Sequence, residues 1–430
     1  MKTIFVKITT ILLPCFFLIS RTDAQFYNGH RMEFGKNRVQ YTDFYWQHYD
    51  FGNYKTYYHI GGDRTARYVG LRARQLITEM EYRLDIRVNN EIIFIVYNDL
   101  LDFRQSNIGL VSGNDEHNIG GVATISNNKI LIYNDGSHSH IDEQIRKSIA
   151  QILVNKLLTG TTITDRLTSA ALKSYPEWFI EGLVSYYGCE FNANKQLLLK
   201  DGLLNGKLEK IQWLTGADAE LAGSSFWNYL AMNYGENTLK DIAYLSRITK
   251  NVTSAFVFIT GIPFKNLVKE WSEYTKYRLQ TENPESIKNH KSKSQIKTKK
   301  NIQYQNFQFD YTETRATYST NQNGKIKIYL NQWEQNKTKK IFKYGHQLPQ
   351  INDDKYPIIR WFPKQPILTW IYENEQKIKL CIYDIETSEL NCRNISYVNR
   401  VLDYNFNADG SQIVFSGIKN GQADLYFLEL

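Results

Sequence analysis

The stretch YPEWFIEGLVSYYG, residues 175–188, decides how the first half of this chain folds. Pro176 favours the start of a helix, because its ring fixes φ and the first helical position needs no amide hydrogen. Trp178 and Phe179 are large aromatic side chains that can anchor the helix in a core. We expect Glu181 in the first turn after Pro176, where the helix dipole favours a carboxylate. The stretch therefore predicts a buried helix with a structural acidic group.

Strand patterns and one long helical pattern precede this helix. Apolar residues recur at helical spacing over residues 63–84, which predicts a helix. Short runs rich in β-branched and aromatic residues predict strands, and Asn127 with Asn128 marks a turn between the last two runs. The strand patterns are YKTYYHI (54–60), EIIFIVYND (91–99), GGVATI (120–125) and KILIYND (129–135). This order predicts a mixed N-terminal sheet.

Helical patterns dominate from about Asp142 to Gln280, and a polar, Lys-rich linker follows over residues 281–306. Within it, KNHKSKSQIKTKK (288–300) holds six lysines and no acidic residue, which explains much of the formal net charge of +8. The run has no interleaved aromatics and no nucleic-acid-binding signature. We therefore expect a solvated linker and no nucleic-acid partner, with contact to an anionic membrane or glycan surface as the alternative.

The chain opens with an export signal. Lys2 and Lys7 precede an apolar run from Ile8 to Ile19, and the small residues of Thr22–Ala24 come before Gln25. This is the pattern of a secretory signal peptide, so residues 1–24 are predicted to be removed. The apolar run is too short to span a bilayer, and no later run is long enough. We therefore expect an exported chain, periplasmic or associated with an outer membrane, without a transmembrane segment.

The four cysteines do not form a disulfide framework. Cys15 lies inside the apolar run, where lipidation is the alternative to simple cleavage, although the preceding proline fits it poorly. After cleavage Cys189, Cys381 and Cys392 remain, without zinc-finger spacing. Cys381 and Cys392 lie in one repeat, so they either bridge in an oxidising compartment or stay as buried thiols.

The tail from Phe307 contains a repeat. In three segments an aromatic residue is followed nine positions later by a second one, and ten positions further on by an apolar residue. The three sets are Phe309–Tyr318–Ile328, Trp361–Trp370–Leu380 and Phe406–Phe415–Leu425. Gly324 and Gly421 lie six positions after the second aromatic, where a hairpin turns. A period of 52 and then 45 residues is typical of propeller blades, with a β-sandwich as the alternative.

These repeats resemble the TolB-type β-propeller, whose blades carry the pattern F-x-x-D-G-x-x-I-x-F. The stretch FNADGSQIVF (406–415) matches it, and the two earlier repeats keep only the aromatic and apolar spacing. Residues 307–430 hold about two and a half blades, whereas a closed ring needs at least four. Because the chain stops inside a strand pattern, DLYFLEL, we expect a longer protein or strands supplied by a partner.

The stretch PEWFIEG (176–182) resembles the third-ligand segment of gluzincin (peptidase MA-like) metallopeptidases. In that family an upstream helix carries HExxH, in which two histidines hold zinc and the glutamate polarises a bound water. Aligning the apolar positions of the upstream helix puts Lys147-Ser148-Ile149-Ala150-Gln151 over HExxH. Lys147 then replaces the first histidine, Ser148 the general base and Gln151 the second histidine. A Lys ammonium repels a divalent cation, so the motif cannot hold zinc.

The resemblance implies an α+β metallopeptidase-like domain over residues 25–280, degenerate at its catalytic positions. The former site would comprise Lys147, Ser148, Gln151 and Glu181, with Glu181 paired to Lys147 and no cofactor. Trp178 and Phe179 are the candidate lining of the old cleft. The expected fold is therefore an α+β metallopeptidase-like domain, with an N-terminal mixed sheet and a C-terminal helical half, followed by an incomplete all-β propeller.

A second candidate metal site lies in GSHSHIDEQ, residues 136–144. His138, His140 and Glu143 are close in sequence, and a His-x-His loop can bind metal. The alternative interpretation is a solvated turn that leads into a helix capped at Asp142 or nearby.

The leading functional hypothesis is a non-catalytic envelope scaffold that binds a protein or peptide, in envelope assembly or secretion by analogy of fold. One alternative is a zinc peptidase with unrecognised ligands, but no histidine lies between residues 141 and 289, where those ligands belong. Another is a glycan- or peptidoglycan-binding module, motivated by the aromatic run YTDFYWQHYDFGNYKTYY (41–58). Such aromatics equally suit a core and its strands.

Overall fold

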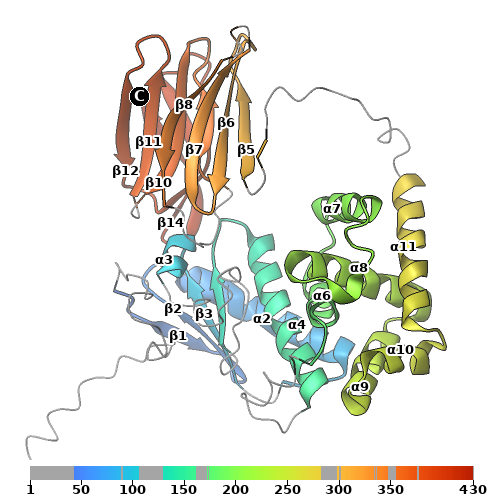
Figure 1. Cartoon of the computed structure of the whole chain (residues 1–430). Coiled ribbons are helices and arrows are strands. Elements are labelled where there is room, and N and C mark those ends of the chain that lie inside the picture. Colours follow the sequence, from blue (N-terminus) through green and yellow to red (C-terminus); the bar gives the residue numbers. More distant parts are fainter. Residues whose placement is uncertain are drawn as a thin grey trace, which may run out of the picture.

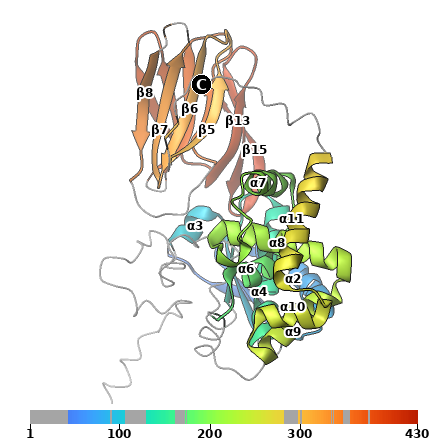
Figure 2. The same cartoon turned by 45° about the vertical axis from the view of Figure 1, so that its right-hand side comes forward.

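The structure is a computed structural model, and it describes residues 43–88, 91–105, 129–160, 172, 174–281, 298–299, 302–333, 335, 337–346, 355–374 and 377–429. The predicted signal peptide, the pattern at 120–125 and most of the Lys-rich run lie outside these residues. An α/β part extends to residue 281, and antiparallel sheets follow from residue 303. Figures 1 and 2 show the α/β part at one end of the strands of these sheets. The described helices include none that is both long and apolar enough to cross a membrane.

A four-stranded sheet forms one layer of the α/β part. Its strands, in spatial order, are β1 (Gln47–Asp50), β2 (Tyr54–Tyr58), β3 (Ile92–Tyr97) and β4 (Lys129–Tyr133). β2, β3 and β4 are parallel, whereas β1 is antiparallel to β2. The predicted helix is α2 (Asp63–Leu84), which supplies the crossover that two parallel strands require. Three strands therefore end at the same edge of this sheet.

The helical half begins earlier than expected, at His138 rather than near Asp142. Ser137 is the N-cap of the first helix, and its Oγ accepts a hydrogen bond from the backbone nitrogen of His140 at 3.3 Å. His138 and His140 therefore lie in a helical turn and not in a loop. The helices are α4 (His138–Thr159), α6 (Glu177–Gly188), α7 (Ala193–Leu204), the 3-10 turn η3 (Ile211–Trp213), α8 (Gly216–Tyr234), α9 (Asn237–Thr249), α10 (Val252–Thr260) and α11 (Phe264–Thr281).

Helix α6 lies at the centre of the helical core. Pro176 is its N-cap, so Glu177 is the acidic residue of the first turn, and Glu181 lies in the second turn. The expected first-turn position of Glu181 is therefore wrong. Trp178 and Phe179 are 1% and 0% exposed and contact the aromatic rings of α8 and α10. They are core residues rather than the lining of a cleft.

Two glycines let α6 and α8 pack unusually close together. A Cβ added to Gly223 of α8 would lie 2.8 Å from the Cα of Gly182 on α6, nearer than side chains tolerate. The indole nitrogen of Trp227 donates to the carbonyl of Phe179 at 3.1 Å across the same contact. The two glycines leave room for the short distance between the helix backbones, and the hydrogen bond stabilises the contact.

The second part consists of three consecutive antiparallel sheets, stacked side by side (Figure 1). The first sheet has β5 (Gln303–Phe309), β6 (Arg315–Gln322), β7 (Lys325–Gln332) and β8 (Lys337–Tyr344). The second has β9 (Ile358–Trp361), β10 (Ile367–Asn374), β11 (Lys377–Asp384) and β12 (Leu390–Ile395). The third has β13 (Arg400–Phe406), β14 (Gln412–Lys419) and β15 (Gln422–Glu429). The sheets begin at Gln303 instead of Phe307, and in the described residues they do not close into a ring.

The predicted repeat is confirmed strand by strand. Phe309, Trp361 and Phe406 each end the first strand of a sheet, and Tyr318, Trp370 and Phe415 each occupy the fourth position of the second strand. Ser319 pairs with Ile328, Ile371 with Leu380 and Ser416 with Leu425. The three sheets therefore share one register. This equivalence supports the blade interpretation over an unrelated sandwich.

Asn-Gly pairs form two of the tight turns within this repeat. Asn323 and Gly324 have φ of 50° and 90°, and Asn420 and Gly421 have φ of 49° and 73°. A left-handed conformation at both positions is the type I′ turn that matches strand twist. Cys381 and Cys392 face each other on β11 and β12 and form a disulfide, whereas Cys189 is a free thiol.

The close approach of α6 and α8 predicts that Gly223→Ala destabilises the protein. Gly to Ala in a helix interior ordinarily stabilises by about 1 kcal/mol, but here the added methyl group meets the α6 backbone. We expect a net loss of about 1–3 kcal/mol from overpacking, measured by urea unfolding followed by far-UV circular dichroism. Asn228→Ala, on the exposed face of the same helix, is the control. Equal or greater stability of Gly223→Ala would contradict the packing described.

Candidate functional site

An ion pair occupies the positions aligned with the metallopeptidase motif. The Nζ of Lys147 on α4 lies 3.0 Å from Oε2 of Glu220 on α8, and the two side chains are 23% and 27% exposed. Burial opposes the charged form of Lys147, but the Glu220 carboxylate, with smaller contributions from Cys189 and Glu181, raises its pKa above the usual value. Burial likewise opposes the charge of Glu220, but Lys147 lowers its pKa. The pair is thus charged at neutral pH.

Lys147 forms its ion pair with Glu220, and the expected partner Glu181 makes a smaller electrostatic contribution. Glu181 acts on Lys147 through its charge, and it is half-buried, as is Gln151. Ser148 is fully buried, and its hydroxyl donates to the carbonyl of Gln144 at 2.8 Å. Sequence reasoning missed Glu220 because it lies on a helix far along the chain, and only packing brings it to Lys147.

The aligned positions do not fit a zinc ion. A catalytic zinc needs about three protein ligands, whereas this site presents an ammonium group, a buried hydroxyl and an amide. Across the residues that the structure describes, no group of three or more His, Cys, Asp and Glu side chains is arranged to hold a metal.

The second candidate metal site is likewise not assembled as a ligand set. His138 packs its ring edge-on against Tyr68, with ring centres 4.6 Å apart. His140 instead turns to Asp135, with Nδ1 at 2.9 Å from Oδ2. Each histidine thus has its own neighbour from a different element, and Glu143 is half-buried on the next turn of α4.

Much of the aromatic run considered for glycan binding packs against the α/β part. Tyr54 is 5% exposed and stacks on Phe51, with ring centres 5.1 Å apart. Trp46 packs edge-on against Tyr97 at 5.4 Å. Tyr45 remains 68% exposed. The structural interpretation of these aromatics is therefore favoured over a glycan-binding surface.

A polar cluster that sequence reasoning missed lies at the ends of the parallel strands. His59 follows β2, Asn98 and Asp99 follow β3, and Asn134 and Asp135 follow β4. The carboxyl edge of a parallel sheet is where ligands and polar side chains gather in α/β proteins. The available signal was the repeated Tyr-Asn-Asp at the end of two strand patterns, which a parallel arrangement places side by side.

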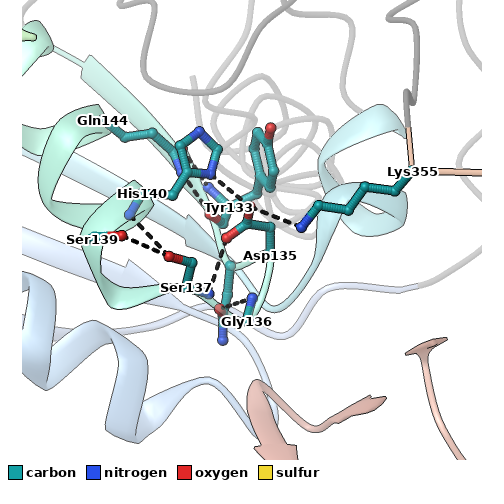
Figure 3. A network of polar contacts seen from close by, with 9 residues as sticks. Tyr133, Asp135, Gly136, Ser137, Ser139, His140, Gln144 and Lys355 are labelled. Atoms are coloured by element: carbon teal, nitrogen blue, oxygen red, sulfur yellow. Dashed lines mark hydrogen bonds and ion pairs between the residues drawn. The ribbon is translucent and has the colours of Figure 1, made fainter. Parts of the chain in front are cut away.

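One half of this cluster is an ion-pair network around Asp135 (Figure 3). Its carboxylate lies 2.9 Å from His140 Nδ1 and 3.5 Å from Nζ of Lys355, which belongs to the second part of the chain. Burial alone would raise the pKa of Asp135, but His140 and then Lys355 lower it to about 2. The side chain of Gln144 fixes the end of β4: its oxygen accepts a hydrogen bond from the backbone nitrogen of Tyr133 at 3.1 Å, and its nitrogen donates one to the carbonyl of Tyr133 at 2.9 Å.

The other half centres on His59 and Asp102. His59 is 6% exposed, and its Nε2 lies 3.3 Å from Oδ2 of Asp102. Burial lowers the pKa of His59 to about 4. Burial, reinforced by the neighbouring carboxyl of Asp99, raises the pKa of Asp102 to about 8. At neutral pH both groups are therefore uncharged, and the backbone N–H of Asn98 donates to Nε2 of His59 at 3.4 Å.

The turn between β14 and β15 covers the strand-end cluster. The side-chain nitrogen of Asn134 donates to the carbonyl of Gly421 at 2.6 Å, and the hydroxyl of Thr65 donates to the same oxygen at 3.2 Å. Beside them Arg64 donates to the side chain of Gln422 at 2.9 Å. In this structure the cluster is thus the joint between the α/β part and the sheets.

The helical half carries a pocket of about 630 Å³, in the size range of ligand sites. Its apolar floor includes Phe264 and Val268 of α11. Polar and charged residues complete the lining: Glu209, Gln212, Thr253, Lys265, Lys269, Ser272, Glu273 and Lys276. Trp213 follows one lining residue in sequence and is 76% exposed, and Phe258 on α10 is 81% exposed. The sequence offered no motif for this pocket, since its residues come from separate elements.

Comparisons with known proteins identify no family for the chain. No family model and no curated protein sequence matches. The similar solved structures include TolB from Acinetobacter baumannii (10% identity, 30% of each chain, TM-score 0.25). The β-propeller domain of the Trilobed protease from Pyrococcus furiosus is another (13% identity, 30% of this chain and 40% of that one, TM-score 0.23). So is an oligogalacturonate lyase in complex with manganese (10% identity, 32% and 38%, TM-score 0.25).

The chain spans well under half the length of each of these three proteins. Propeller proteins thus occur among its structural neighbours, including a TolB protein as the repeats suggested, and these three do not bear on the metallopeptidase resemblance. At these TM-scores the likenesses carry no argument about function.

The neutral state of Asp102 predicts a pH effect on stability. Its pKa is 3.8 in the unfolded chain and about 8 in the fold, so the folded form binds one proton more between those values. The contribution of Asp102 to the unfolding free energy therefore falls as pH rises, by up to about 1.4 kcal/mol per unit, whereas the lowered pKa of His59 acts in the opposite direction below pH 6.5. Asp102→Asn, which stays neutral, should gain stability relative to the native chain between pH 5 and pH 8, as measured by urea unfolding. The exposed Asp241→Asn should show no such gain, and an equal response of both variants would disprove the assignment.

Proposed function

We propose that this chain is a non-catalytic, exported scaffold of the cell envelope that binds a protein or peptide partner. The observation that carries the proposal is the ion pair between Lys147 and Glu220, 3.0 Å apart and largely buried. A cation stands where a metallopeptidase needs a metal ligand, and its charge is balanced inside the protein. In the proposed ancestry the helices of a peptidase site persist, and their polar groups now stabilise the fold.

A disulfide in the antiparallel sheets supports export of the chain. Cys381 and Cys392 form a disulfide, and such bonds persist in oxidising compartments outside the cytosol. The leader-like pattern of residues 1–24 points in the same direction.

The partner-binding site in this proposal is the pocket of the helical half. Its apolar floor of Phe264 and Val268 suits apolar side chains of a peptide. Lys265 and Lys269, which also line the pocket, can bind backbone carbonyls or acidic groups, although Lys269 lies 3.9 Å from the carboxylate of Glu273. Trp213, next to the lining residue Gln212 in sequence, and Phe258, on the same helix as the lining residue Thr253, are also exposed, and exposed aromatics of this kind are enriched in protein interfaces. A scaffold needs such a surface, whereas the buried former site offers none.

The non-catalytic assignment predicts that the purified chain contains no stoichiometric zinc and cleaves no peptide. Lys147 repels a metal ion, and Glu181 alone supplies too few ligands. Metal analysis by mass spectrometry and a fluorogenic peptide library measure the two properties, with Glu181→Ala as the matched variant. One equivalent of zinc, or hydrolysis that a chelator and Glu181→Ala both abolish, would overturn this assignment.

The peptide-binding assignment predicts that a phage-displayed library of random peptides yields binders selected on the full chain. Ser272→Trp fills the pocket from α11 and should weaken these binders at least tenfold, because a half-buried small side chain is replaced by a large one. Asp241→Trp, exposed on α9, is the control and should leave binding unchanged. Failure to select any binder, or equal binding to both variants, would count against the pocket.

A further inference from the structure

The last turn of the short helix α10 projects from the helical core. Val257, Phe258 and Ile259 are consecutive residues, and they are 44%, 81% and 36% exposed. Successive helix positions are about 100° apart, so three of them span roughly 200° of the helix surface. A helix that lay flat on the core would bury at least one of these side chains. The turn is therefore apolar and solvent-exposed around more than half of its circumference.

The first half of the same helix is fixed in the core. Ala255 and Phe256 are both 0% exposed, and the ring of Phe256 lies 6.2 Å from that of Trp178 on α6. Gly261, with φ of 74°, ends the helix, and α11 begins at Phe264. The exposed apolar turn is therefore held in place by packing on one side and by a helix on the other.

Helix α9 adds to this apolar surface. It packs against α10, and its residues Tyr244 and Ile248, one helical turn apart, are 52% and 58% exposed. Figures 1 and 2 both show α9 and α10 at the end of the α/β part that faces away from the sheets. We call this end of the molecule the α9–α10 tip. Runs of exposed apolar side chains are uncommon on a protein surface unless they bind something.

The charges in the sequence of this tip are of one sign. Residues 242–269 contain Arg247, Lys250, Lys265 and Lys269 and no acidic residue, and α10 itself, VTSAFVFIT, carries no charge. Lys250 and Lys265 precede and follow α10 in the chain, and both are exposed. An apolar turn between two exposed cations is complementary to a surface that is anionic outside and apolar beneath.

The other charges close to the tip already have neighbours. Lys269 lies 3.9 Å from the carboxylate of Glu273. The guanidinium of Arg247 lies over the ring of Tyr244 at 4.7 Å and donates to a backbone carbonyl of α4 at 3.0 Å. Asp241, the nearest preceding acidic residue, follows Lys240 directly in sequence, so the two cancel in net charge. Lys250 and Lys265 therefore remain as the cations available to a ligand.

We propose that the α9–α10 tip binds the surface of a lipid bilayer with anionic headgroups. Val257, Phe258 and Ile259 enter the boundary between headgroups and acyl chains, which interfacial apolar side chains reach to a depth of about 5–10 Å. Lys250 and Lys265 bind the headgroup phosphates beside them. Helix α10 has nine residues, too few to cross the hydrocarbon core, so the contact involves one leaflet.

A bilayer fits this tip better than a protein partner does. A protein would have to supply both a cavity for a projecting turn and acidic groups beside it, whereas an anionic bilayer supplies an apolar layer under a charged surface everywhere. The inference goes beyond the proposed peptide binding, because Phe258 does not line the pocket of the helical half, although Lys265 does.

Co-sedimentation with lipid vesicles tests the proposal. The chain is used from Gln25, because the apolar leader predicted before it would itself bind lipid. We expect binding to vesicles of phosphatidylglycerol and phosphatidylcholine, and weaker binding to phosphatidylcholine alone. Phe258→Asp should weaken binding to the mixed vesicles at least tenfold, because a charged side chain enters the apolar layer. The control is Tyr82→Asp on α2, 87% exposed, which should bind like the native chain.

A second pair of variants tests the contribution of charge. Lys250→Gln with Lys265→Gln should weaken binding by about 30-fold, because each lysine close to an anionic surface contributes about fivefold. Lys337→Gln with Lys340→Gln removes the same charge from exposed positions on β8 and should have little effect. Circular dichroism checks that every variant is folded.

Several outcomes would overturn the proposal. They are no binding of the native chain to the mixed vesicles, equal binding to phosphatidylcholine alone, binding that Phe258→Asp leaves unchanged, or equal losses from the two lysine pairs. Self-association of the native chain that Phe258→Asp abolishes would assign the tip to a second copy instead. Ser272→Trp, which fills the pocket, should leave vesicle binding unchanged, so failure of lipid binding and failure of peptide binding are separate results.

Discussion

Three glycines allow the helical core to form, and most features of the α/β part depend on them. Gly182 and Gly223 let α6 and α8 meet backbone to backbone, and a Cβ on Gly188 would lie 2.5 Å from the Cα of Lys147 on α4. Helix α6 thus holds α4 on one side and α8 on the other at short distance. This spacing brings Lys147 within 3.0 Å of Glu220. The ion pair at the former site is a consequence of helix packing.

The second part depends on repetition rather than on one contact. Equivalent positions in three sheets carry apolar residues, and each sheet covers one face of its neighbour. Such an array buries side chains only where a neighbour exists, so its two end faces stay exposed. Leu380 on the inner strand β11 is 0% exposed under the third sheet, whereas Leu425 on the edge strand β15 is 71% exposed.

The joint between the two parts is polar and contains titratable groups. A backbone carbonyl at Gly421 accepts from Asn134 and Thr65, while Lys355 reaches Asp135. Near it, His59 and Asp102 stay uncharged at neutral pH because burial disfavours both charged forms. Hydrogen bonds and an ion pair thus connect the sheets to the α/β part, and Leu402 packs against Gly136 at the same joint.

Local pattern in the sequence determined the elements. Period-two and helical spacings placed β2, α2, β3 and β4, and the aromatic spacing placed equivalent residues of three sheets, because these signals depend only on near neighbours. The neighbouring patterns also predicted that Trp178 and Phe179 are buried. Packing between distant segments decided the rest. Glu220 reached Lys147, and Gly421 reached the strand ends, through contacts that no local pattern encodes. Glu181 was misplaced by one turn, because it is the fifth residue of a helix that begins at Glu177 and so lies beyond the first turn. Elements follow from short-range sterics and hydrophobicity, whereas a site follows from the distances between elements, which only the tertiary structure sets.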